Sequence, residues 1–70
     1  MTRDDLHNRF DYHKPKDATV AARHEKVRTL CRDLAENLMD LTPPTREQSL
    51  AITKLEEVMF WANAAIARNQ

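Results

Sequence analysis

The chain has 70 residues, with 11 basic and 11 acidic side chains and a formal net charge of zero at pH 7. A domain of this size buries only roughly 60% of its unfolded surface, so it is marginal when folded alone. Its one cysteine, Cys31, excludes an intrachain disulfide, and no apolar run approaches the roughly 20 residues that cross a bilayer. Self-association is therefore the stabilising device that we expect, and the single thiol suits a reducing, cytoplasmic location.

The charge is unevenly distributed along the chain. Residues 9–32 hold seven basic and three acidic side chains, whereas residues 33–70 hold three basic and six acidic ones. Zero net charge argues against a binder of long polyanions, so duplex nucleic acid and membranes are not expected partners. The absence of glycine excludes Gly-rich phosphate loops and favours helices. A small anionic ligand held by side chains fits this composition.

The N-terminal residues 1–18 are predicted to form an arm ahead of a hairpin domain at 19–70. Residues 1–8 are either a short helical turn or a frayed start, and residues 9–18 are expected to be non-helical, because Pro15 biases Lys14 toward extended geometry. Asp17 and Thr19 could each cap the helix that follows. Of the two, Thr19 is the predicted cap.

The arm carries two aromatic rings among basic groups, which suits stacking on bases and pairing with phosphates. The candidate ligand-binding residues of the arm are Arg9, Phe10, Tyr12, His13 and Lys16. A structural alternative stays open, in which the two rings cover the open end of the hairpin as a small separate core.

The first long helix is expected at about 19–41. Its predicted contact seam consists of Val20, His24, Val27, Cys31, Leu34, Leu38 and Leu41. Leu30 and Met39 lie off this seam, so the helix has more apolar surface than one partner helix can cover.

Basic side chains lie in the first turns of this helix. Arg23 and Lys26 share a face, and Arg28 points elsewhere. They form either a solvated basic face or, with the arm folded back, an anion pocket near the helix N-terminus. Lys26 and Arg28 are the candidate phosphate ligands.

Pro43 and Pro44 end the first helix, and Thr45 with Gln48 reads as a capping box for a second helix at about 46–68. Its apolar positions form two parallel stripes, Ile52, Leu55, Met59, Ala62 and Ile66 beside Ala51, Val58 and Ala65. A short link makes the two helices antiparallel neighbours. The predicted fold is thus all-α, an antiparallel helical hairpin with a short N-terminal arm or helix, assembled into a compact homo-oligomer.

A second candidate pocket lies in the run Trp61–Arg68 and would use Trp61, Asn63 and Arg68. Asn63 among alanines lowers helix stability, so a side-chain partner is expected, and the preferred interpretation is an interchain hydrogen bond beside a packed tryptophan. The three histidines fit no metal-ligand spacing, and no arrangement of side chains supports catalysis. We therefore expect neither an enzyme nor a metal or other cofactor.

Four ordered motifs extend over most of the chain: RFxYHxPK at 9–16, TRE at 45–47, SLAxTKLEE at 49–57 and WANAAIAR at 61–68. With them the chain resembles the phage anti-CBASS cyclic-oligonucleotide sponges, which share a helical hairpin domain with some anti-Thoeris sponges. The resemblance implies a non-enzymatic homohexamer in the host cytoplasm. Such a protein sequesters cyclic dinucleotides, and in some members cyclic trinucleotides at separate pockets. By this resemblance Tyr12 contacts the ligand, and Lys26 or Arg28 meets its phosphate.

Two hypotheses follow. The first is a sponge that starves the host effector of its signal. The alternative is a structural oligomerisation or protein-interaction module that binds another protein through Phe60 and Trp61.

Overall fold

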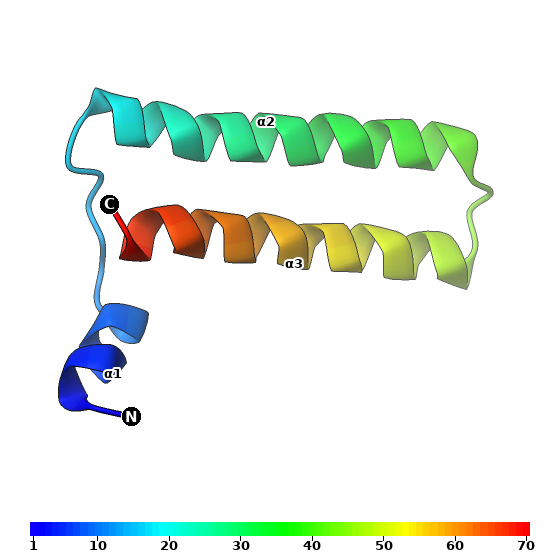
Figure 1. Ribbon diagram of the computed structural model, residues 1–70. Coiled ribbons are helices and arrows are strands. Elements are labelled where there is room, and N and C mark those ends of the chain that lie inside the picture. The colour runs from blue at the N-terminus through cyan, green and yellow to red at the C-terminus, as the bar shows by residue number, and fades with distance from the viewer.

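The computed structural model describes residues 1–70, and all of its regular structure is helical. It consists of α1 (Arg3–Phe10), α2 (Ala18–Leu41) and α3 (Arg46–Arg68). In Figure 1, α2 and α3 lie side by side and antiparallel, and α1 projects from the end where α2 begins and α3 ends. The predicted all-α hairpin is confirmed. No helix combines the length and the apolar character that crossing a membrane would require.

The N-terminal segment is a true helix, closed by a capping box. The Thr2 hydroxyl accepts a hydrogen bond from the Asp5 N–H at 3.0 Å, and the Asp5 carboxylate accepts one from the Thr2 N–H at 3.1 Å. Hydrogen bonding from Thr2 also lowers the pKa of the Asp5 carboxyl below its ordinary value of 3.8. α1 continues through Arg9 and Phe10 and ends at its C-cap Asp11, whose N–H bonds to the His7 carbonyl oxygen, so the sequence prediction had wrongly left Arg9 and Phe10 outside helix.

Asp17, and not Thr19, caps α2. Its Oδ1 accepts a hydrogen bond from the Val20 N–H at 3.0 Å, and the helix begins at Ala18. The prediction of Thr19 was wrong because the helix already begins at Ala18, so Thr19 lies inside its first turn and the cap position falls on Asp17. At Asp17 the extended backbone leaves the carboxylate free to accept the bond from Val20.

The link between α2 and α3 is held by Gln48. Thr45 caps α3 and accepts a hydrogen bond from the Gln48 N–H at 3.3 Å, as predicted. The Gln48 side chain does not bond back to the Thr45 N–H, so the predicted capping box is only half formed. Its Nε2 donates to the carbonyl oxygens of Met39 and Thr42, at 3.3 and 3.1 Å, and to the Thr42 hydroxyl at 3.0 Å. It thereby fills acceptors at the end of α2 that helix geometry leaves unpaired.

The contact between the helices follows a slightly different stripe from the predicted seam. The least exposed residues of α2 are Val20, His24, Val27, Cys31, Ala35 and Leu38, whereas Leu34 is 48% and Leu41 80% exposed. Leu34 and Leu41 were therefore wrongly placed in the contact. In a straight α-helix a seven-residue repeat drifts by about 20° per heptad, so the step from Cys31 to Ala35 keeps the stripe on its partner. The α3 stripe of Ile52, Leu55, Met59, Ala62 and Ile66 lies in the contact as predicted.

A polar pair joins the two helices within this apolar contact. The His24 Nδ1 lies 3.0 Å from the Asn63 Oδ1, and both side chains are partly buried. Asn63 therefore has a partner in the same chain, and the interchain hydrogen bond preferred from the sequence stays a prediction.

We expect this pair to contribute measurably to the stability of the hairpin. His24→Ala, Asn63→Ala and the double variant should give a coupling free energy of about 1 kcal/mol, because each single change leaves a partly buried polar group without its partner. The measurement is urea unfolding at one fixed protein concentration. A coupling free energy near zero would show that water replaces the bond without loss.

Candidate functional site

The two aromatic rings of the N-terminal segment do not pack on the hairpin. The Phe10 side chain, on the last turn of α1, is 80% exposed, and Tyr12, in the arm that follows, is 85% exposed. In the single chain they therefore cover no core, contrary to the structural alternative. The two rings are therefore open to solvent, and the α1 segment that carries Phe10 projects from the end of the hairpin where α2 begins (Figure 1).

The arm itself has a defined path. The His13 Nε2 lies 2.7 Å from the Asn8 carbonyl oxygen, which folds the arm back on the last turn of α1. Lys14 and Lys16, on either side of Pro15, are bonded through their backbone groups to the side chain of Gln70. Sequence reasoning missed Gln70. The available signal was topological, because an antiparallel α3 must end beside the start of α2.

The two candidate phosphate ligands of α2 point in different directions. Lys26 and Arg28 are two residues apart, which places them about 200° apart around the helix axis. Arg28 forms an ion pair with Glu25, and both side chains are largely exposed. Lys26 has no ion pair. One ligand cannot contact both side chains of the same chain from one side of α2.

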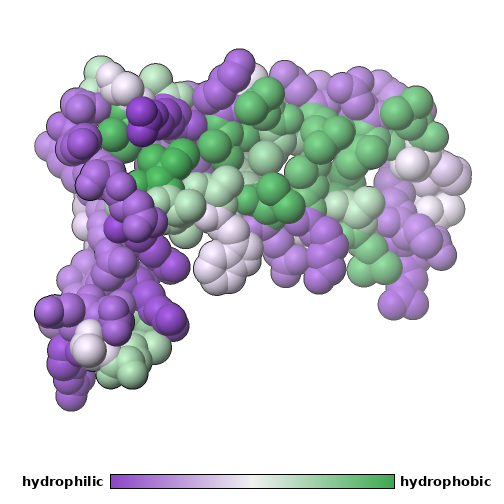
Figure 2. Space-filling model, in the orientation of Figure 1, coloured by the Kyte–Doolittle hydropathy of each residue, from purple (hydrophilic) through white to green (hydrophobic).

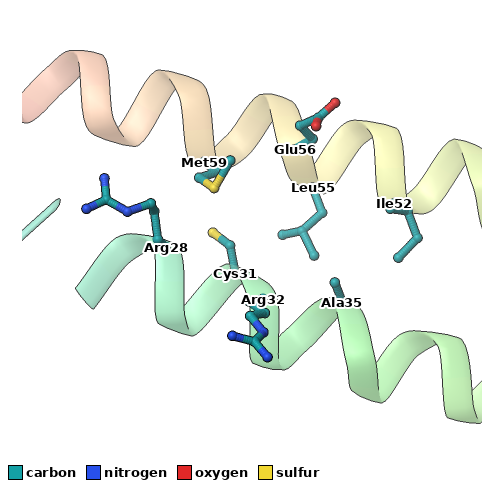
Figure 3. A pocket seen from close by; sticks show the side chains of 8 residues that line it. All are labelled: Arg28, Cys31, Arg32, Ala35, Ile52, Leu55, Glu56 and Met59. Atoms are coloured by element: carbon teal, nitrogen blue, oxygen red, sulfur yellow. The ribbon is translucent and has the colours of Figure 1, made fainter. Parts of the chain in front are cut away.

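Arg28 borders a groove between α2 and α3 that has an apolar floor. The groove is lined by Arg28, Cys31, Arg32, Ala35, Ile52, Leu55, Glu56 and Met59. In Figure 3, Cys31 and Met59 point toward one another between the helices, and Arg28 lies beside them. No residue of the arm lines this groove. A single chain therefore does not bring Tyr12 and the α2 cations into one pocket.

The second candidate pocket is assembled only in part. The Arg68 guanidinium carbon lies 6.0 Å from the centroid of the Trp61 ring, at the outer limit of a cation–π contact. Both residues border a shallow depression with Phe60 and Ala64. Asn63 is turned toward α2 by its bond to His24, so it does not join Trp61 and Arg68.

No three or more His, Cys, Asp or Glu side chains lie together in a way that could hold a metal ion. Two of the three histidines are instead engaged in hydrogen bonds, His13 with Asn8 and His24 with Asn63.

A large apolar surface covers one side of the hairpin. We define the apolar face as Leu30, Leu34, Leu41, Ala51, Val58 and Ala65, all exposed. On each helix these residues lie on the flank of the contact stripe opposite to Arg32 and Glu56, which border the groove of Figure 3. They therefore share the other side, where Figure 2 shows hydrophobic residues along both α2 and α3. Only Val20 is fully buried in the single chain, at 3% exposure.

No curated protein and no solved structure matches the chain. Among protein families, the one described as Acb2/Tad1, hairpin domain, matches residues 2–67, which include all of α1 and α2 and all but the last residue of α3. Membership of that family implies a nucleotide-sponge role without catalysis. Since the match spans nearly the entire chain, this protein belongs to the Acb2/Tad1 hairpin-domain family of anti-CBASS and anti-Thoeris sponges.

Proposed function

We propose that this protein binds cyclic oligonucleotide second messengers and holds them without cleaving them, which blocks host CBASS signalling in the cytoplasm of the infected cell. Cyclic dinucleotides are the primary ligands, and cyclic trinucleotides are candidates for a second site. The family match over residues 2–67 is the observation that carries this proposal. The absence of glycine agrees with it, because phosphates must then be held by side chains or by a helix N-terminus.

The arm supplies the chemistry that recognises the bases. The exposed rings of Tyr12 and Phe10 can each stack on a base, and stacking contributes about 1–3 kcal/mol per base. Arg9, His13 and Lys16 lie near the rings in the sequence and carry hydrogen-bond donors, although the His13 Nε2 is bonded to Asn8 in the free protein. Charge-assisted hydrogen bonds to phosphate are the stronger kind.

The site becomes complete only in an oligomer of this chain. Within one chain Tyr12 borders no groove with Lys26 or Arg28, so the phosphate ligand in our proposal comes from a second copy. A cyclic dinucleotide has two bases and two phosphates in approximate two-fold symmetry. A two-fold interface offers one tyrosine and one cation from each copy, which matches that symmetry.

The apolar face is the surface that supports self-association. Its leucines and valine would otherwise remain in water, and burying an aliphatic side chain of this size contributes about 1.5–3 kcal/mol. Ala51 and Ala65 on α3 leave room for a neighbouring helix to approach closely. We propose a homohexamer, whose three-fold axis could also hold a cyclic trinucleotide near Trp61 and Arg68.

The test is to recover the ligand after binding. The protein is saturated with a radiolabelled cyclic dinucleotide, freed of excess ligand, denatured in acid and analysed by chromatography. Release of intact cyclic dinucleotide supports sequestration, whereas linear product would make the protein a phosphodiesterase. A parallel calorimetric panel of cyclic di- and trinucleotides that gives no heat with any ligand would instead favour the protein-interaction module.

A further inference from the structure

We infer that Gln70 is a positioning residue that holds the ligand-binding arm in its binding-competent conformation. Its side-chain Oε1 accepts a hydrogen bond from the Lys16 N–H at 2.8 Å, and its Nε2 donates one to the Lys14 carbonyl at 3.0 Å. One carboxamide thus pairs with the backbone on both sides of Pro15, in the way that a neighbouring β-strand would. The inference rests on the proposed function, because the arm must contact the ligand for its position to matter.

Gln70 provides the only polar connection between the arm and the hairpin. No other hydrogen bond and no ion pair joins residues 1–16 to residues 17–70. The bond from His13 to Asn8 is internal to the N-terminal segment, and α1 forms no packed interface with α2 or α3. Without Gln70 no hydrogen bond or ion pair would join residues 1–16 to the hairpin.

The Gln70 side chain is itself held in place. Its Nε2 also lies 3.4 Å from the Ala67 carbonyl oxygen, which is one of the unpaired acceptors at the end of α3. The carboxamide is therefore fixed to the helix terminus while it binds the arm. Because Tyr12 lies two residues before Lys14, its position relative to α2 and α3 depends on this contact.

The two hydrogen bonds from Gln70 to Lys14 and Lys16, which we call the clamp, hold the arm in position before the ligand binds, and the expected effect of removing them follows from this. An arm that samples many positions is binding-competent for only part of the time, and the apparent dissociation constant rises by the inverse of that fraction. Two backbone hydrogen bonds of ordinary strength correspond to a fall in affinity of about tenfold. The fall in affinity should appear mainly as a slower association rate. The dissociation rate should change little, because in the complex the ligand itself holds the arm.

The experiment compares Gln70→Ala with Asn69→Ala in the full chain. Asn69 is the matched control, because its side chain bonds only to Ala65 within α3. The probe is the cyclic dinucleotide that binds the unmodified protein most tightly in calorimetry. Gln70→Ala should lose hydrogen-exchange protection at the Lys16 amide and bind about tenfold more weakly, with helix content and oligomer mass unchanged. Asn69→Ala should keep both the protection of the Lys16 amide and the affinity of the unmodified protein.

Tyr12→Ala in the same series separates the two claims. If Gln70→Ala binds as tightly as the unmodified protein while Tyr12→Ala has lost affinity, the role of Gln70 is overturned and the proposed function stands. An unprotected Lys16 amide in the unmodified protein would also overturn the clamp. If the unmodified protein binds no cyclic dinucleotide, both the proposed function and the positioning role fail.

Discussion

Replacing Tyr12 with alanine is expected to weaken cyclic dinucleotide binding by about 5- to 150-fold for each base on which the ring stacks, which corresponds to about 1–3 kcal/mol per base. The ring is 85% exposed in the single chain, so its removal disturbs no packed core. The oligomer and the helix content should therefore remain unchanged. Isothermal titration calorimetry measures the affinity, and light scattering measures the mass.

Tyr12→Phe is the matched control for this prediction. It keeps the aromatic face and removes only the hydroxyl, so it should retain most of the affinity if stacking provides the binding energy. A Tyr12→Ala protein that binds with normal affinity would assign the arm a structural role and remove the central residue from the proposed site.

Introducing a charge into the apolar face should abolish assembly. Leu34→Glu places a carboxylate where we propose that a second copy packs, and an unpaired charge in such an interface costs several kcal/mol. In a two-fold contact the cost arises twice. The mass measured by light scattering at micromolar concentration is expected to fall from that of the oligomer to that of the monomer.

Thr29→Glu provides the control for the charge. Thr29 is exposed on the side of α2 that lies away from α3, among other polar side chains, so the same substitution there should leave the mass unchanged. Val58→Glu tests the apolar face from α3 and should behave like Leu34→Glu. If both carboxylate variants on the apolar face retain the oligomer mass, the interface lies elsewhere on the hairpin.

The hairpin was predictable because its determinants are local. Two adjacent prolines mark the link, Thr45 marks the start of α3, and apolar spacing marks the inner stripe of α3. The errors have equally local causes. Leu34 and Leu41 were assigned to the contact because they fit a strict seven-residue repeat, which the contact stripe of a straight helix does not follow. Ala35 was not assigned to it because its side chain is small and only weakly apolar.

The candidate site was harder to predict because it depends on contacts between distant residues. The pairing of His24 with Asn63 spans 39 positions, and that of Lys16 with Gln70 spans 54. Residue types alone did not select these partners. The sequence nevertheless placed Tyr12 in a non-helical segment outside the hairpin, because Pro15 disfavours helix in the residues beside it.

The scarcity of buried side chains has a consequence for how much of the protein must be made before it is useful. A chain that encloses only Val20 has few buried contacts of its own, so in the proposed oligomer its stability would depend on the concentration of its copies. At low copy number newly made chains would open readily and be degraded by proteases. Above a threshold abundance they would protect one another, so the capacity to absorb ligand should rise more steeply than the rate of synthesis.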